Sequence, residues 1–552
     1  MRSAFVALLA GLAVPAAASS VSDTPLLFGP ICHGEAPPAI AGPHKLVMLP
    51  GMGNDHMAAD TQSPEAQRWF DYGLTLGRSF EHADAVLAFQ RAEAADPRCS
   101  LCIWGEAWAS GPNVNFGPKP AEIPRLLAMA RKAQSIAGPL AVGPIKPLET
   151  ALVDRYGGKN SFWTGPVNGN LAYARDLDAL QRSNPDDVEV AIFDAEAWLI
   201  RENHDQDPSG PTRAVEVLGP LLPSHPDSSG LIHFYVHASE DAGEPELAAP
   251  YAGKLATLAP LASHMVHMPS HTWFRLGRYE DAAQANVAAL DADRSYAERT
   301  DFPTPLGPKT YHAHDLVFGI GAAMMSGDGA IALGLVRRFT QDFPAPYDTG
   351  AQYSAAVALE AFGRFAPAQS VLDAPDATAG KPFRAAMRHY ARGEALLRLR
   401  RSGEARAEAA LVTLPGGGSS DAGIAARVEI ARLTLQGDAD LLDHRPDDAA
   451  KAFADAARTQ ETRLPRYFDP PAWWFPVRRS LAAALLAKGD ATGAERETAA
   501  VLRVWKLDPI TLAIQAAAER RLGQSDAAAK DEATARAGWH GDPAELSAAT
   551  TI

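Results

Sequence analysis

The chain has 552 residues, of which 47% are hydrophobic and 21% are charged, as in an ordinary globular protein. Its formal net charge of −15 argues against nucleic acid and anionic membrane surfaces as the main partners. A single core rarely grows to this length, whereas stacked repeats can, because each repeat packs only on its neighbours. Ala-rich segments with few alternating β-branched runs favour helices over sheets.

The first residues have the pattern of a secretory signal. Arg2 supplies a positive charge, residues 4–14 are apolar, and small residues at 16–19 offer a cleavage site. We therefore expect a signal peptide over residues 1–19 and a secreted protein, most simply in a bacterial periplasm. No later segment is long and apolar enough to predict a membrane span after cleavage. A tethered form that keeps the signal uncleaved is the alternative.

The rest of the chain divides by composition into an irregular part and helical parts. Residues 20–61 are rich in Pro and Gly and lack periodicity, which predicts an irregular N-terminal arm that drapes over the first repeats. Helical periodicity predicts a repeat stack over residues 62–414 and further repeats over 424–552. The run Pro415-Gly-Gly-Gly-Ser-Ser420 predicts a linker or long loop at residues 415–423.

A repeat begins near Ala66. With Ala66 as position 1, small or aromatic residues and a Pro occupy positions 4, 8, 20, 24, 27 and 32, namely Trp69, Gly73, Ala85, Phe89, Ala92 and Pro97. This pattern resembles the tetratricopeptide repeat, in which two antiparallel helices cross at small residues. Turn and second-helix signals recur, most clearly from Leu276 to Ala289. The predicted fold is therefore an all-α, tetratricopeptide-type α-solenoid of stacked antiparallel helix pairs.

Further blocks resemble a bacterial family of secreted tetratricopeptide-repeat proteins. They lie at residues 80–85, 96–105, 111–115, 267–279 and 467–473 and span most of the chain. The resemblance implies the repeat architecture and carries no activity.

Three cysteines, Cys32, Cys99 and Cys102, leave at least one unpaired if a disulfide forms. Cys99 and Cys102 follow Asp96-Pro97 and are expected at the start of a helix, where thiol pKa values fall. A structural disulfide or two packed thiols is the plain interpretation; a redox pair, or a second metal site with His56, is the alternative. Haem attachment is disfavoured because Ile103 stands where that motif needs His.

The histidines repeat with the period of the helices. His233 and His237 recur 34 residues later as His267 and His271, at positions 5 and 9 of successive repeats. This register takes Ala248 and Ala282 as position 20 of each second helix. It places His264 and His314 at position 2 of their repeats and Glu240 at position 12.

Positions 2, 5, 9 and 12 of the first helices face the concave groove of such a stack. Neighbouring first helices pack about 8–10 Å apart, so imidazoles from adjacent repeats are expected to meet. Up to five histidines with Glu240, and His314 from the next repeat, can then surround one or two cations. Imidazole favours a transition metal, with Zn or Cu first. Pro269 lies inside one of these helices and either kinks it or begins it.

Three functions follow from this cluster and from Cys99 and Cys102. The first is a periplasmic protein that binds a metal ion or a small ligand or peptide in a His-lined groove. The second is a metal-dependent hydrolase or oxidase with Glu240 as its base. The third is a redox role for the cysteines. The first function also has a metal-free form, in which the protein is a scaffold that binds a peptide or protein. Phosphate-cradling and His-Glu-x-x-His motifs are absent from the sequence, so we expect no nucleotide cofactor.

Overall fold

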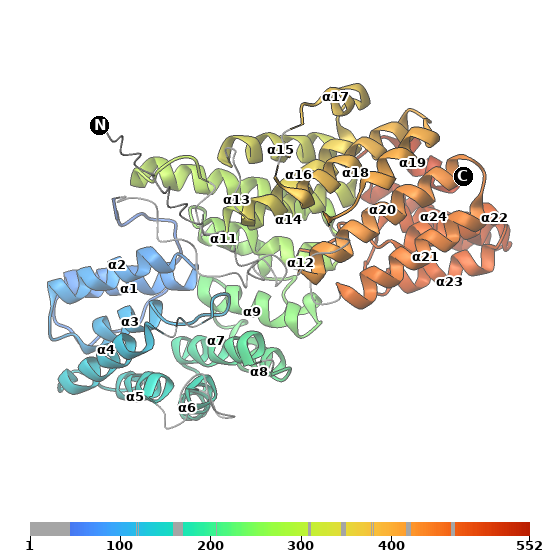
Figure 1. Cartoon of the computed structure of the whole chain (residues 1–552). Helices are drawn as coiled ribbons and strands as arrows, with labels where there is room; N and C mark the ends of the chain where they lie inside the picture. Colours follow the sequence, from blue (N-terminus) through green and yellow to red (C-terminus); the bar gives the residue numbers. More distant parts are fainter. Residues whose placement is uncertain are drawn as a thin grey trace, which may run out of the picture.

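The fold is all-α throughout the described part of this computed structural model (Figure 1). The structure describes residues 45–117, 119, 121–157, 169–205, 207–306, 311–343, 349–376, 378, 380–415, 421–464 and 470–551. The predicted signal peptide, Cys32, the first part of the predicted arm and most of the predicted linker lie outside these ranges. Within them, none of the helices combines the length and apolar composition that a bilayer crossing needs.

Successive helices pack as antiparallel pairs, and the first helices of neighbouring pairs contact one another. The N-terminal pairs are α1 (Pro64–Arg78) with α2 (His82–Ala95), α3 (Ser100–Ala109) with α4 (Ile123–Ile136), α5 (Ile145–Gly157) with α6 (Gly169–Ser183), and α7 (Val188–Asp205) with α8 (Gly210–Leu218). The central elements are α9 (Ser229–Asp241), α10 (Leu255–Leu258), α11 (Ser263–His267), α12 (Pro269–Arg275), α13 (Tyr279–Thr300), α14 (His312–Ser326) and α15 (Gly329–Asp342).

The C-terminal half continues in the same manner. Its helices are α16 (Thr349–Phe365), α17 (Ala368–Asp373), α18 (Pro382–Arg398), α19 (Ser402–Leu411), α20 (Ala422–Leu442), α21 (Pro446–Arg463), α22 (Arg478–Lys488), α23 (Ala491–Leu502), α24 (Pro509–Arg521), α25 (Ser525–Gly538) and α26 (Pro543–Thr551). The predicted tetratricopeptide-type solenoid is confirmed by this succession of helix pairs.

The first pair shows why these residues fold as a repeat. The Ser63 side chain accepts a hydrogen bond from the amide of Ala66, and Pro64 occupies the first turn of α1, where no amide hydrogen is needed. Where α1 crosses α2, a Cβ on Gly73 would lie 2.9 Å from the Phe89 ring. The small residue at position 8 is therefore required for the two helices to approach.

One predicted second helix is wrong. The register places Ala248 at position 20 of a regular helix, but this stretch forms the 3₁₀ turns η3 (Pro245–Leu247) and η4 (Ala252–Lys254), followed by the short α10. Pro245 and Pro250 lack the amide hydrogen that an α-helix interior needs, so no long helix forms here. The repeat keeps its length while its outer layer becomes irregular.

The described part of the arm, residues 45–61, packs against the repeats. The amide of Lys45 donates to the carbonyl of Thr300, and the amide of Leu261 donates to the carbonyl of Gly51. The Met52 side chain is only 1% exposed. The arm thus ties α1 to helices that lie some two hundred residues further along the chain.

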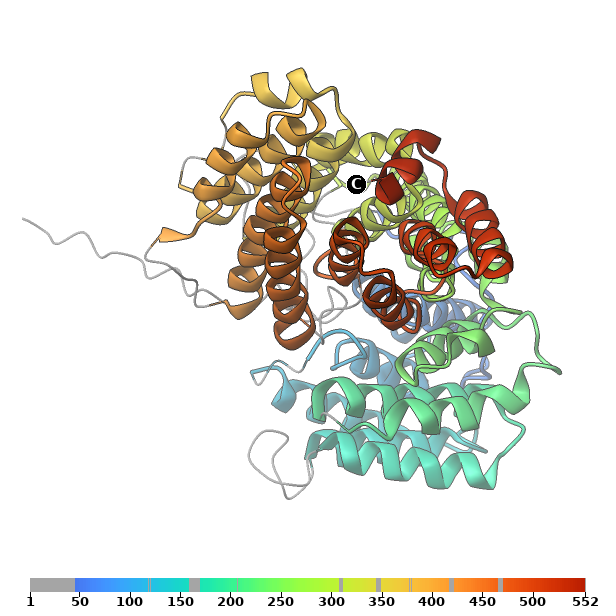
Figure 2. The same cartoon turned by 90° about the vertical axis from the view of Figure 1, so that its right-hand side faces the viewer.

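The last repeats return to the middle of the chain (Figure 2). The Tyr279 hydroxyl donates to the carbonyl of Lys506 at 3.0 Å, and the amide of His540 donates to the carbonyl of Ser326 at 2.8 Å. A single apolar cluster includes both Phe383 and Phe453, on either side of residues 416–420. The C-terminal repeats therefore share a core with the repeats before that predicted linker.

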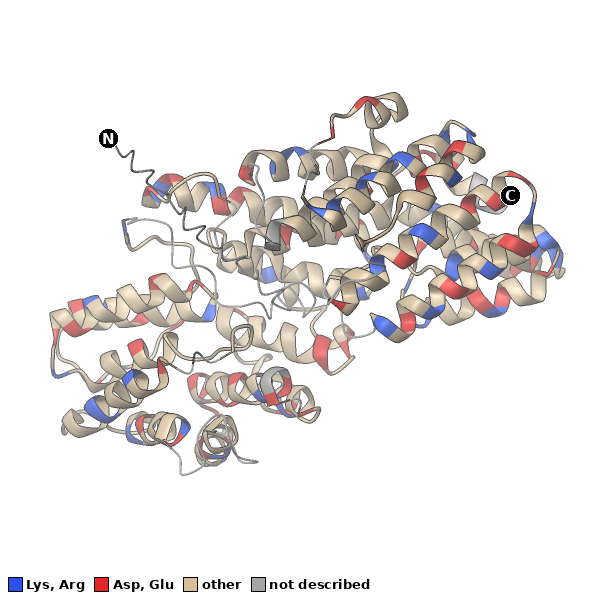
Figure 3. Ribbon diagram, viewed as in Figure 1, with Lys and Arg blue, Asp and Glu red and all other residues tan. Residues whose placement is uncertain are grey.

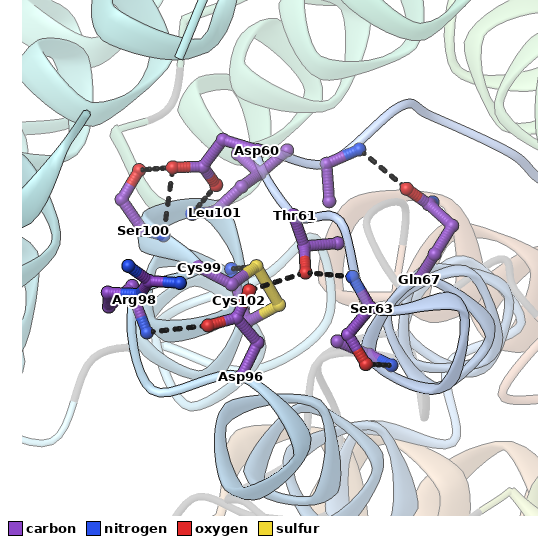
Figure 4. The surroundings of a disulfide bond; sticks show 12 residues. Asp60, Thr61, Ser63, Gln67, Asp96, Arg98, Cys99, Ser100, Leu101 and Cys102 are labelled. Carbon is purple, nitrogen blue, oxygen red and sulfur yellow. Dashed lines mark hydrogen bonds between the residues drawn. A yellow bond between two sulfur atoms is a disulfide. The ribbon is translucent and has the colours of Figure 1, made fainter. Parts of the chain in front are cut away.

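Cys99 and Cys102 form a disulfide at the start of α3 (Figure 4). Both side chains are fully buried. Asp60 of the arm accepts hydrogen bonds from the amides of Ser100 and Leu101 and so caps the same helix end. This geometry favours a structural disulfide, which is the plain interpretation of the cysteine pair.

We expect the Cys99–Cys102 disulfide to resist reduction in the native protein, because a reductant cannot reach sulfur atoms that are fully buried. Thiol labelling after incubation with dithiothreitol should be slow without denaturant and complete in 6 M guanidinium. Fast labelling of both cysteines in the folded protein would instead support the redox interpretation.

Candidate metal centre

Six buried histidines converge at the centre of the molecule. They come from α9, α11, α12 and α14, whose ribbons carry few charged residues (Figure 3). Their ring nitrogens form two groups of three, within each of which the ligand atoms lie within 4.8 Å of one another. One group is His233, His237 and His264, and the other is His267, His271 and His314. The histidines singled out by the repeat register are therefore brought together.

Pro269 does not interrupt the helix face that carries the histidines. It occupies the first turn of α12, and Met268 separates this helix from α11 while keeping helical backbone angles of φ −50° and ψ −37°. His264 joins the two histidines of α9, while His267 and His271, on either side of the break, join His314 of the next repeat. The division between the two triads therefore falls between His264 and His267, within α11.

His271 is held by a carboxylate. Its Nδ1 lies 2.6 Å from Oε2 of Glu240, and Nε of Arg275 donates to Oε1 of the same carboxylate at 2.6 Å. Since an ionised carboxylate only accepts hydrogen bonds, Nδ1 of His271 carries the proton. In the neutral ring, Nε2 is then the acceptor nitrogen, and it faces Nε2 of His267.

His267 is held by an amide in the same way. Asn286 donates through Nδ2 to the carbonyl of Ala282 at 2.8 Å, which turns its Oδ1 toward Nδ1 of His267 at 2.7 Å. Nδ1 of His267 is therefore also a donor, and its Nε2 is also an acceptor. The Nε2 atoms of His267 and His271 lie only 2.7 Å apart, and that of His314 lies 3.1 Å from His267.

The other triad has a comparable anchor in the main chain. Nδ1 of His233 donates to the carbonyl of Arg78 at 2.6 Å, which leaves its Nε2 free to face Nε2 of His264 at 3.0 Å. Nδ1 of His264 has no hydrogen-bond partner among the described residues. Ligating histidines commonly donate their second ring nitrogen to a carbonyl or carboxylate, which is the arrangement of His233 and His271.

Burial disfavours the charged form of three of these rings. It lowers the pKa of His233 to about 3 and lowers the pKa values of His264 and His267 well below their ordinary range. Burial alone would raise the pKa of Glu240, but the neighbouring His271 and Arg275 outweigh it and hold the pKa of this carboxyl below its usual value. Neutral imidazoles beside an ionised carboxylate are the protonation states that bind a metal.

Aromatic rings close off both triads. Phe80 lies 4.6 Å from the His233 ring and 4.7 Å from the His264 ring, centroid to centroid. Phe318 lies 5.3 Å from His267 and 5.1 Å from His271. No repeat pattern in the sequence, such as the one the histidines follow, marks Phe80 or Phe318, and neither residue is predicted as part of the site.

The triads are buried and do not line an open groove, contrary to expectation. The exposed fraction of the six histidines is between 0% and 5%. Besides the aromatic rings, the loop at Asn115 covers the site, because its Nδ2 donates to the Tyr311 hydroxyl at 2.7 Å and the Tyr311 ring lies tilted, 4.5 Å from the His264 ring. Side chains from other repeats therefore cover the triads where an open groove was expected.

Glu240 is placed to orient His271, since both of its oxygens are engaged by protein groups. His312 is two residues from His314 but belongs to neither triad. Its Nδ1 lies 2.7 Å from Asp293 and its Nε2 3.1 Å from Asp342, so it links α13, α14 and α15. Burial would lower the pKa of His312, but the two carboxylates outweigh it and raise the pKa.

The remaining candidates lie elsewhere. Cys99 and Cys102 are joined to each other, so neither offers a thiolate to a second metal site while the disulfide is intact. His56 is exposed and bonds to Asp71. Trp474 borders a cavity of about 350 Å³ in the C-terminal half. These positions contribute nothing to the two triads.

A metal ion held by the triad of His271 should bind about 10–100-fold more weakly in Glu240→Gln, because a carboxylate that orients a ligand histidine also raises its basicity. Competition with a chromophoric chelator measures the affinity. Glu244→Gln, an exposed change in the same repeat, is the matched control and should leave the affinity unchanged. Equal affinities for the two variants would show that Glu240 does not support a ligand.

Comparisons with known proteins add little to this description. No protein-family model matches the sequence, and no curated protein matches it. Solved structures that it resembles include the human IFIT1 dimer with m7Gppp-AAAA, at 12% identity over 87% of this chain and 91% of that chain, with a TM-score of 0.30. The P58(IPK) TPR domain is 12% identical over 83% of this chain and 99% of that chain, with a TM-score of 0.21. The APC/C hetero-tetramer Cut9–Hcn1 is 11% identical over 89% of each chain, with a TM-score of 0.29. Such weak likeness carries no argument about ligands or activity.

Proposed function

We propose that this tetratricopeptide-type solenoid binds two transition-metal ions, one in each histidine triad. The observation that carries the proposal is the 2.7 Å approach of Nε2 of His267 to Nε2 of His271. Both Nδ1 atoms face oxygen acceptors, so in the neutral form of the two rings the Nε2 lone pairs would face each other. A cation between them removes this repulsion.

The spacing of the nitrogens supports a metal ion in that place. A metal binds imidazole nitrogen at about 2.0–2.1 Å, so two ligands of a tetrahedral ion lie about 3.3 Å apart. The Nε2 pairs at 2.7, 3.0 and 3.1 Å are close to this separation. Three protein ligands for each ion leave a coordination position for an exogenous ligand, as catalytic metal sites do.

Elemental analysis of protein purified without chelators tests the proposal. We expect two metal ions per chain, with copper or zinc as the first candidates. The double change His237→Ala and His271→Ala removes one ligand from each triad and should abolish stoichiometric metal while the helical circular dichroism persists. The double change His56→Ala and His444→Ala, at two exposed histidines, should keep both ions. Wild-type protein that binds no metal on reconstitution would refute the proposal.

We propose further that the protein is secreted, in keeping with its resemblance to bacterial secreted repeat proteins. Residues 1–19 have the pattern of a signal peptide, and the Cys99–Cys102 disulfide is the redox state expected in an oxidising compartment such as a periplasm. Fractionation of the producing cells, with the mature N-terminus sequenced, tests this. An intact N-terminus in the cytoplasmic fraction would count against it.

The cavity beside Trp474 supports a second partner, a small ligand or peptide. Its volume of about 350 Å³ lies within the range of about 300–1,000 Å³ that ligand pockets occupy. Arg364 and Arg479 lie 5.1 and 5.2 Å from the Trp474 ring, and the acidic residues Glu394, Asp438 and Glu545 line the same cavity, so its wall is aromatic and carries both signs of charge. Binding of a peptide that survives loss of the metal and disappears in Trp474→Ala would assign it to this cavity.

A further inference from the structure

The two triads are close enough to act together. The rings of His264 and His267 lie 5.8 Å apart, and those of His237 and His271 lie 5.9 Å apart, centroid to centroid. His264 and His267 are three residues apart on α11 and therefore share a face of that helix. Rings at these distances are compatible with the separation of about 3.5–4 Å between the ions of two-metal sites.

Resting on the proposed metal binding, we propose that the two triads form one coupled dinuclear copper centre that binds dioxygen between its two ions. Because the triads lie side by side, the two ions that they hold would be neighbours. The position left open on each ion by three histidine ligands supplies the place for a shared ligand.

The charge of the site favours copper. Two divalent ions bound by six neutral imidazoles would bury four positive charges, which is costly at full burial. Two Cu(I) ions bury only two. Glu240, 2.6 Å from Nδ1 of His271, and Asp315, 3.4 Å from Nδ1 of His267, are placed to offset them. Copper also stands highest in the affinity order of divalent metals for nitrogen ligands.

The walls of the site favour a small, uncharged ligand. Phe80 stacks on the His264 ring of one triad, Phe318 lies tilted against the His271 ring of the other, and the two side chains are 1% and 2% exposed. Such surroundings exclude bulky substrates and disfavour free anions, because entering would strip their water. Dioxygen is both apolar and small.

The reaction balances without another reactant. Each Cu(I) gives one electron, so the pair reduces O2 by two electrons to the peroxide level and becomes two Cu(II). The O–O bond is kept, and neither a proton nor an external reductant is consumed. Loss of O2 returns both electrons to the copper ions.

Anaerobic loading of the full chain with two equivalents of Cu(I), followed by exposure to O2, tests the inference. We expect uptake of one O2 for each pair of copper ions, with an intense charge-transfer absorption. Electron paramagnetic resonance should detect little of the Cu(II), because the two spins couple. Two copper ions per chain with the full signal of independent Cu(II), or with no O2 uptake, would overturn the dinuclear inference and leave metal binding intact. A chain that retains zinc but no copper would overturn the dinuclear copper inference alone, and a chain that retains neither metal would refute both proposals.

A variant isolates the coupling. His314→Gln removes one ligand of one triad and should leave a single copper per chain, which takes up no O2 as Cu(I) and gives the full signal of an isolated ion when the variant is loaded with Cu(II) instead. His56→Gln, an exposed change, should behave as wild type. If circular dichroism shows that His314→Gln does not fold, X-ray absorption of the wild-type copper form decides instead. Copper–copper scattering at about 3.5–4 Å is expected, and its absence overturns the inference.

Discussion

Removal of the metal should lower the free energy of unfolding by about 4 kcal/mol for each site, if free metal otherwise exceeds its Kd about 1,000-fold. The metal stabilises the folded chain because the triads exist only in that state, so the free energy of metal binding adds to the free energy of unfolding. The apo form also leaves Nε2 of His267 and Nε2 of His271 facing each other at 2.7 Å. Urea titration followed by circular dichroism, with and without chelator, measures the difference.

The double variant His237→Ala, His271→Ala is the control for this measurement. Its unfolding midpoint should lie below that of the metal-bound wild type and should not respond to chelator. A chelator that strips the ions from the wild type without moving the midpoint would contradict the prediction. It would mean that the triads are held in place by packing alone.

The architecture is predictable because its signals are local. The positions of Gly73 and Phe89 within one repeat fix how α1 crosses α2, and the structure keeps that contact. The period of 34 residues likewise carries His233 and His237 onto the next repeat, so their approach to His267 and His271 follows from sequence alone. Each of these inferences needs only a repeat length and a helix face.

The sorting of the histidines is not predictable in the same way. It depends on which neighbouring helix each imidazole meets: His264 groups with the histidines of α9, whereas His267, on the same short helix, groups with His271 and His314. His264 and His267 are three residues apart and share a helix face, so their spacing alone does not assign them to different sites. Only the structure shows that the division falls between them and that Pro269 leaves His267 and His271 together.

The groups that orient the ligands are the hardest to find in the sequence. The partner of His233 is the carbonyl of Arg78, 155 residues away, and a carbonyl carries no residue signal. Phe80 has a positive φ of 63°, which no pattern of apolar residues indicates. Burial of the triads is also non-local, because Phe80, Phe318 and the loop at Asn115 with Tyr311 supply the cover.

Arg78→Met should destabilise the protein by about 3–5 kcal/mol, the cost of leaving buried charges without a partner. The Arg78 side chain is fully buried, with its Nη1 3.0 Å from Asp55 of the arm and 2.5 Å from Glu189 of α7. It also lies 4.9 Å over the Phe193 ring. Loss of the guanidinium should therefore release the arm as well as weaken the contact between α1 and α7. Urea unfolding measures the first effect, and limited proteolysis of residues 45–61 measures the second.

The matched change Arg98→Met, at an exposed arginine, should leave stability within about 0.5 kcal/mol of wild type. A triple variant, Arg78→Met with Asp55→Asn and Glu189→Gln, removes all three charges and should recover part of the loss. Recovery would attribute the cost to the unpaired carboxylates, whereas no recovery would attribute it to lost packing against Phe193. Since the Arg78 carbonyl anchors His233 at 2.6 Å, release of the arm should also loosen metal in the first triad more than in the second. An equal loss of metal affinity at both triads would show that the arm does not support the first triad. Arg78 would then act on stability alone.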